Sequence, residues 1–333
     1  MAFSRVLRFA DPLPCQAAVQ GSDVEIFPTA RGDFITEITQ IRMNRLWMQR
    51  FYVSLPQVFT LVSKPDRRSI SFLTQSGSSL QHCGLEVSPG AIIVNGFNVV
   101  HERSGANIRR GAMSLPADEF YAAIETLVGR DFPEKLRNLI IQPNPILMSR
   151  LLKLHKTVGQ LARDTPDMLE LPEVCRALEQ KLIHVMVRCL AEGAAVESST
   201  GGSRHDAVLA RFEGFLEANP NRPLYLPEIC AAIGVAERTL RACCEEHLGM
   251  GPIRYLTLRR MHLVRRALLY AEPSKATVTH IVTDHGFWEL GRFSVAYRTL
   301  FGESPSETLR RPAANRPRVL SRPSSLETGR YLN

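Results

Sequence analysis

The chain contains 333 residues, of which 44% are hydrophobic and 22% are charged, and these values describe an ordinary globular protein with room for two cores. The formal net charge of +8 favours an anionic partner such as nucleic acid, with a merely basic protein as an equal alternative. No segment has the roughly 18 apolar residues of a membrane span, and the N-terminus lacks a signal-peptide core, so we expect a cytoplasmic location and no membrane partner.

The cysteines favour a reducing compartment without a disulfide framework. The chain has seven of them, an odd number, and they form no Cys-x-x-Cys motif. Four fall in segments with a helical pattern, where a cysteine acts as a small core residue.

The first third of the chain favours β-structure. Residues 1–30 are expected to be irregular, because three prolines interrupt them. From 33 to 113, short apolar or alternating segments are separated by turn signals, with clear alternation at 34–41 and a Pro-Gly turn at 89–90. Many short strands of this kind predict a small barrel or a sandwich.

The middle of the chain changes to a helical period. The expected helices cover 117–128, 145–162 and 171–191. The two long ones either cover the open side of the β-structure or pair with a second subunit, and covering is favoured about two to one. Residues 194–204 are expected to be a flexible linker, because most of them are small, polar or glycine.

The last third contains one short pattern twice, at 226–248 and 278–300. Each copy has a short helical segment, a glycine (Gly234 or Gly286), and a second amphipathic segment. The glycine allows a turn with positive φ. This order is typical of a helix-turn-helix, whose second helix enters the DNA major groove in DNA-binding proteins. The residue four positions before each glycine should lie where the two helices cross, and these residues are Cys230 and Val282.

Residues 252–270 predict a helix that joins the two units, beginning with Pro252. A rigid connection fixes the spacing of the two second helices, and two insertions on one DNA face should lie about 34 Å apart. The tail at 312–333 is rich in Pro, Ser and Arg, so we expect it to be disordered.

These motifs give residues 205–311 a specific resemblance to the DNA-binding domain of AraC/XylS-family transcription regulators. The second unit and the residues after it carry the family's closing motif: Gly286-Phe287, Phe293, Tyr297, Phe301-Gly302 and Ser304-Pro305-Ser306. The first unit matches through Ile229-Cys230, Gly234-Val235, Leu240 and Gly249-Met250-Gly251-Pro252, and the family's connecting-helix arginine falls on Arg260. A narrower likeness is to the branch with ethanolamine-utilisation regulators, through segments such as Gly286 to Gly291.

Four positions depart from the family pattern. Ala236 stands where the family has a Ser or Thr cap, and alanine caps a helix poorly. The other three, Cys230, Cys244 and Val282, are packing differences that affect fine geometry more than function.

The register of the resemblance implies eight DNA-binding residues: Glu237, Arg238, Arg241, Ala242, Arg292, Ser294, Val295 and Arg298. Arg238, Arg241 and Arg292 are the best candidates for contacts to guanine, with solvated or phosphate-bound arginines as an even alternative. For Arg298 a phosphate contact or an ion pair is favoured, and Trp288 is expected in the core or stacked beside the turn.

The resemblance also covers residues 33–193, less specifically, and implies a small cupin-like β-barrel with helices that binds a small-molecule effector, dimerises, or both. His82, His101 and Glu102 are the tempting metal cluster, but the His-x-His of metal-binding cupins is missing, so we expect no metal and no cofactor. Residues that could line a ligand cavity are more often ordinary core or surface, and they include Trp47, Phe51 and Phe97, with Arg45 or Arg50 for an anion.

The sequence therefore predicts an α+β protein: an effector-sensing or dimerisation domain at 1–193, the linker at 194–204, and an all-α DNA-binding domain at 205–311 with two helix-turn-helix units joined by a long helix. Its expected partners are double-stranded promoter DNA, RNA polymerase, an unidentified effector and a second copy in a homodimer. No catalytic motif is present, so an enzyme is not expected. The alternatives are a cupin-like enzyme fused to a DNA-binding module, and an architectural DNA binder without sequence preference.

Overall fold

The computed structural model describes residues 3–96, 99–128, 139–196, 200–219 and 224–311. It has a sheet-rich N-terminal part and a helical C-terminal part, so the α+β class is confirmed. The predicted disordered tail at 312–333 lies outside the described residues.

The strands form two antiparallel sheets. The first has the order β1-β3-β4-β11-β6-β9-β12-β13 and the second β2-β5-β10-β7-β8. Their bounds are β1 Phe3–Phe9, β2 Ser22–Pro28, β3 Thr36–Arg42, β4 Trp47–Val53, β5 Gln57–Ser63, β6 Arg67–Leu73, β7 Leu80–His82, β8 Leu85–Glu86, β9 Ile92–Asn95, β10 Val100–Ser104, β11 Ile108–Pro116, β12 Leu139–Gln142 and β13 Ala194–Val196.

The described strands lie in two open sheets, so the small barrel is not found as a closed structure, and the cupin-like form stays a prediction. The N-terminal segment is also not irregular: β1 and β2 flank α1 (Pro12–Ala18), and each strand is an edge of one sheet. The prolines are compatible with this order because they occupy the first turn of α1 and the last position of β2.

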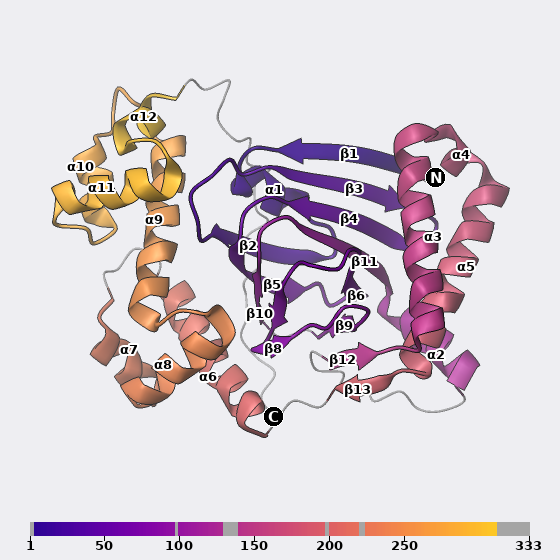
Figure 1. Cartoon of the computed structure of the whole chain (residues 1–333). Helices are drawn as coiled ribbons and strands as arrows, with labels where there is room; N and C mark the ends of the chain where they lie inside the picture. Colours follow the sequence, from indigo (N-terminus) through magenta and orange to yellow (C-terminus); the bar gives the residue numbers. More distant parts are fainter. Residues whose placement is uncertain (1–2, 97–98, 129–138, 197–199, 220–223, 312–333) are drawn as a thin grey trace.

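The first sheet is a middle layer with a core on each face. In β9, the side chains of Ile92 and Val94 pack into one core and that of Ile93 into the other, as the two-residue period of a strand requires. One core includes Ile38 and Phe59 from the two sheets. The other lies under four helices: α2 Ala117–Val128, α3 Pro145–Asp164, α4 Asp167–Glu170 and α5 Pro172–Ala191. The long helices therefore cover the sheet, as the favoured alternative predicted (Figure 1).

Within the predicted linker at 194–204, residues 194–196 and 200–204 belong to secondary-structure elements, and 197–199 lie outside the described residues. Its first residues form β13, which pairs with β12, and its last residues belong to α6 (Thr200–Ala218). Small residues often indicate flexibility, but Ala194–Val196 gain backbone hydrogen bonds from a strand far away in the sequence.

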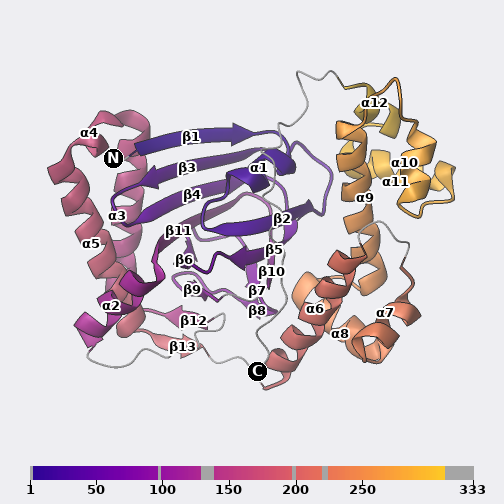
Figure 2. The same cartoon turned by 180° about the vertical axis from the view of Figure 1, so that it is seen from behind.

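The helical part lies at the end of the sheets opposite to α3 and α5 (Figures 1 and 2). After α6 it contains α7 Leu226–Ile233, α8 Glu237–Leu248, α9 Pro252–Tyr270, α10 Val278–Asp284, α11 Leu290–Phe301 and α12 Pro305–Arg310. Phe27 and Val58 of the second sheet share a core with α6, α7 and α8, which joins the two parts. No described helix is both long and apolar enough to cross a membrane.

Both predicted turns contain a left-handed glycine. Gly234 ends α7 with φ 67°, and Gly286 follows α10 with φ 78°. In each turn the amide after the glycine donates to the carbonyl four positions before the glycine: Val235 N to Cys230 O at 3.0 Å, and Phe287 N to Val282 O at 3.2 Å. The two copies of the sequence pattern therefore build the same turn.

We predict that Gly234→Ala lowers the free energy of unfolding by about 1 kcal/mol, because an alanine in the left-handed region is strained. A Cβ at this position would meet no atom within 4 Å, so the backbone is the source of the cost. The matched control is Gly214→Ala in the interior of α6, also without a contact, which should stabilise the protein by roughly 0.5–1 kcal/mol. Urea unfolding of both variants measures the difference, and equal effects would contradict the strained turn.

Candidate nucleic-acid interface

The first helix-turn-helix consists of α7 and α8 packed on an apolar core. Ile229 and Cys230 of α7 and Leu240 and Cys244 of α8 are buried, so Cys230 occupies the crossing predicted for it. Ala236 precedes α8 and makes no side-chain cap hydrogen bond, in agreement with the predicted weak cap.

The second helix-turn-helix consists of α10 and α11 and is closed by α12. Val282, Phe293 and Tyr297 are buried, and the Tyr297 hydroxyl lies 2.9 Å from that of Thr308 in α12. Ser304 forms a capping box with Glu307 at the start of α12. The residues of the closing motif therefore form the packing between α11, the second helix of this unit, and α12.

Helix α9 holds the two units at its opposite ends (Figure 1). Its 19 residues correspond to a length of about 28 Å. Arg260 of α9 places its guanidinium over the ring of Phe287, 5.1 Å from the centroid, and burial lowers the pKa of this arginine. Arg260 therefore fixes the second unit to the connecting helix and does not belong to the exposed basic surface.

All eight predicted DNA-binding residues have exposed side chains. Four lie on α8 and four on α11, namely Glu237, Arg238, Arg241, Ala242, Arg292, Ser294, Val295 and Arg298. Arg241 pairs with Glu237 at 2.9 Å and Arg292 with Glu289 at 2.8 Å, both in solvent. Exposed pairs of this kind contribute little stability, so these arginines can exchange their partner for DNA at low cost. Their contact with DNA stays a prediction.

One alternative placed Trp288 in the core. That alternative is wrong, because the side chain of Trp288 is 69% exposed. The neighbouring Phe287 takes the core position instead, with its ring centroid 4.8 Å from that of Phe293. Sequence reasoning also missed Tyr225 before α7 and Ile253 at the start of α9, which are 67% and 58% exposed. Apolar residues of this kind are usually expected to be buried, and only the tertiary structure shows that these two face solvent.

Buried polar contacts join this helical part to the sheets. The carboxylate of Glu213 in α6 accepts a hydrogen bond from the Tyr255 hydroxyl of α9 at 2.7 Å and lies 3.2 Å from Nε2 of His101 in β10. Burial alone would raise the pKa of Glu213, but His101, Arg259 and Tyr255 outweigh it and lower this pKa. At the other end of α9, Arg265 donates to the Asp11 carboxylate at 2.6 Å.

His82, His101 and Glu102, the cluster for which no metal was expected, divide between two faces of β10. His101 faces Glu213, whereas Glu102 lies 2.7 Å from Nδ1 of His82 and accepts from Arg110 at 2.5 Å. This division follows from the strand itself, because adjacent strand residues point to opposite faces. Burial would raise the pKa of Glu102, but Arg110 and His82 together lower it, so Glu102 is a charged partner in a buried network.

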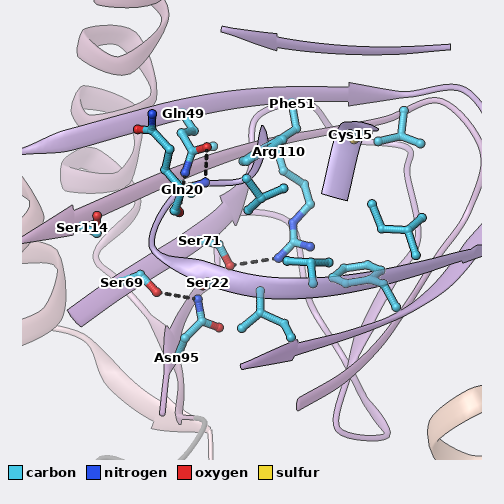
Figure 3. Close-up of a pocket in the computed structure, with 18 of the residues that line it drawn as sticks. Cys15, Gln20, Ser22, Gln49, Phe51, Ser69, Ser71, Asn95, Arg110 and Ser114 are labelled. Carbon is cyan, nitrogen blue, oxygen red and sulfur yellow. Dashed lines mark hydrogen bonds between the residues drawn. The ribbon is translucent and has the colours of Figure 1, made fainter. Parts of the chain in front are cut away.

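A cavity of about 90 Å³ lies between the two sheets (Figure 3). Among the residues that could line a cavity but were more often expected as core or surface, Trp47 and Phe51 do line it. Arg45 and Arg50 do not: Arg45 pairs with Glu119, and Arg50 donates to Nδ1 of His155. Phe97 lies outside the described residues. The arginine at the cavity is Arg110, which donates to Ser71 at 3.0 Å, and other polar lining groups come from Gln20, Gln49, Ser69 and Asn95.

The cavity wall contains polar atoms without a partner among the described residues. These buried oxygens are Gln20 Oε1, Thr36 Oγ1, Gln57 Oε1 and Asn95 Oδ1. Buried polar atoms are rarely left unpaired in proteins, so a small polar guest would have hydrogen-bonding partners here.

Comparison with known proteins identifies the helical part. Residues 229–311 match the family described as "Helix-turn-helix domain". A probable thc operon regulatory protein of Rhodococcus erythropolis is 32% identical over 50% of this chain and 54% of its own length. The XylDLEGF operon transcriptional activator 2 of Pseudomonas putida is 35% identical over 28% of this chain and 60% of its own. The chain thus spans little more than half the length of these curated relatives.

Among solved structures, the AraC-like transcriptional activator CuxR aligns with 85% of this chain and 100% of its own, at 16% identity and a TM-score of 0.41. The narrower likeness to ethanolamine-utilisation regulators stays a prediction. With its two glycine turns, its capped closing helix and these relatives, the C-terminal part of this chain is a helix-turn-helix domain of the AraC/XylS type.

Proposed function

We propose that this chain is a sequence-specific transcription regulator that binds double-stranded promoter DNA. The observation that carries the proposal is the pair of exposed, arginine-bearing helices α8 and α11 at the two ends of one rigid helix. The length of α9, about 28 Å, is close to the roughly 34 Å between successive major-groove faces of DNA. Two helices held at a fixed spacing favour binding to a defined DNA site over the alternative of an architectural DNA binder without sequence preference.

The recognition surface divides by residue type. Arg238, Arg241 and Arg292 can each donate two hydrogen bonds to guanine O6 and N7, which makes them the base-reading candidates. Arg298 lies later on α11 and suits a phosphate contact. Glu237, Ala242, Ser294 and Val295 complete the surface by discriminating between neighbouring bases, for example by apolar contact with a thymine methyl.

The cavity between the sheets is our proposed effector site. At about 90 Å³ it is smaller than the roughly 150 Å³ cavity that holds benzene, so the effector is a molecule of few heavy atoms. Glu102 neutralises Arg110, and the remaining polar lining is uncharged, which favours a neutral polar compound.

A buried connection could carry the effector's influence to DNA binding. Arg110 at the cavity binds Glu102 of β10. The preceding residue on that strand, His101, contacts Glu213 of α6, and Glu213 accepts a hydrogen bond from Tyr255 of α9. A ligand that displaces Arg110 therefore acts on the strand that supports the helices. Control of this kind requires that the ligand bind one arrangement more tightly than the other.

The remaining expectations belong to the same proposal. The named relatives are transcription regulators, which supports a chain without enzymatic activity. Contact with RNA polymerase, formation of a homodimer and a cytoplasmic location are expected of a regulator of this type.

We predict that Arg238→Ala and Arg292→Ala each weaken binding to a selected promoter fragment by about 10- to 100-fold, because each removes a bidentate base contact worth about 1–3 kcal/mol. Pull-down of genomic fragments at physiological salt selects the site, and titration measures the affinity. Arg150→Ala on α3, which lies across the sheets from the helical part, is the control and should bind as wild type does. Equal enrichment of unselected DNA by all three variants and wild type would favour the architectural binder.

We predict that a neutral polar compound that occupies the cavity raises the melting temperature of the wild type and changes its affinity for DNA. Asn95→Leu should remove the thermal shift, because it replaces a polar lining group. Glu213→Gln should keep the thermal shift but reduce the change in DNA affinity, because it weakens the link to His101. A full change in DNA affinity in Glu213→Gln would contradict the proposed connection.

A further inference from the structure

Two helices bring metal-binding side chains together at the junction between the helical part and the sheets. His205 belongs to α6, and Glu246 and His247 are adjacent near the end of α8. One ligand atom from each lies within 4.8 Å of the others. Nδ1 of His205 is 2.5 Å from Oε2 of Glu246, and the two imidazole centroids are 6.3 Å apart.

The imidazole of His247 has unmet hydrogen-bonding capacity. It is fully buried, and among the described residues neither ring nitrogen has a hydrogen-bond partner. Buried polar groups in proteins are rarely left without a partner, so these two nitrogens are available for a ligand.

Further groups surround the same point. Asp206, next to His205, places Oδ1 at 3.6 Å from Nδ1 of His247. On the sheet side, the turn between β7 and β8 presses against the cluster: a Cβ on Gly84 would lie 3.0 Å from Cγ of Glu246. The cluster therefore has a closed side toward the sheets, while the partly exposed His205 and Asp206 leave a route from solvent.

We propose that His205, Glu246 and His247 form a binding site for a divalent transition-metal ion such as Zn²⁺, with Asp206 within reach as a fourth ligand. Two imidazoles with carboxylates favour such ions over Mg²⁺ or Ca²⁺, which prefer oxygen ligands alone. Zinc–nitrogen distances of about 2.0–2.1 Å place the ligand atoms of a tetrahedral site roughly 3.3 Å apart. Modest side-chain rotations would bring the three ligand atoms, now within 4.8 Å of one another, to that separation.

The site differs from the cluster suspected in the sequence, since it uses none of His82, His101 and Glu102. Its consequence is a cross-link between α6 and the last turn of the recognition helix α8, which would stiffen the first helix-turn-helix against the rest of the chain. The binding itself does not depend on whether the chain regulates transcription.

The test is Zn²⁺ binding to the full chain after treatment with a chelator, measured by competition with a chromophoric chelator. The wild type should bind one ion at this site, and His205→Gln and Glu246→Gln should each weaken that binding at least tenfold, because even the loss of a group that only orients a metal ligand weakens binding by about 10- to 100-fold. Both residues are partly exposed, so these variants should fold, and thermal unfolding checks that they do. The visible spectrum of bound Co²⁺ provides a second readout of the nitrogen–oxygen ligand set.

The matched control is His280→Gln, which removes an exposed histidine that pairs with Asp284 at 3.5 Å on α10. This variant should bind Zn²⁺ as tightly as the wild type. The proposal is overturned if the wild type fails to compete with the chelator, or if folded His205→Gln and Glu246→Gln bind with unchanged affinity, which would assign the ion to cysteines elsewhere.

Discussion

The buried carboxylate of Glu213 is the contact on which the arrangement of the two parts depends. It sits between the Tyr255 hydroxyl of the connecting helix and His101 of the second sheet, so one charge links three elements from distant parts of the sequence. A buried carboxylate is costly unless its hydrogen bonds are satisfied, and removal of one partner leaves that cost uncompensated. The position of the helices relative to the sheets is therefore specified by the hydrogen bonds that the buried Glu213 carboxylate needs, as well as by apolar packing.

The first sheet sets the conditions for the cavity. Because β9 sends alternate side chains to opposite faces, one face packs under α3 and α5 and the other faces the second sheet. The space between the sheets holds an apolar core that includes Ile38 and Phe59, and Ser69, Ser71 and Asn95 add polar groups to the wall of the cavity. The cavity wall therefore combines apolar surface with a few polar groups, as small-molecule sites do.

The outward faces of α8 and α11 differ from the cavity wall, because their side chains make few contacts with the rest of the protein. Arg241 and Arg292 are paired only with exposed carboxylates, whereas the inward Arg260 and Arg265 are held by a ring and by buried acidic groups. The same residue type thus serves two purposes: arginines that face inward hold α9 in place, and those that face outward remain available for an anionic partner.

Local sequence determined the helix-turn-helix units, because each depends on residues close together along the chain. The glycines with positive φ and the buried residues Cys230 and Val282 at the crossings were predicted from neighbouring residues, and each predicted recognition residue is exposed. The family resemblance selected these eight residues, and their positions on α8 and α11 explain why all of them are exposed.

Contacts between distant segments were decided only by the tertiary structure. The two open sheets, the strand at Ala194–Val196 and the edge strands before residue 30 arise from pairings whose partners lie far away along the chain. Trp288 faces solvent because Phe287 fills the core position beside it, and His205 meets Glu246 and His247 because α6 and α8 cross. A sequence shows which residues are apolar enough to be buried. Tertiary packing decides which of two neighbouring residues is buried and which distant charged side chains come into contact.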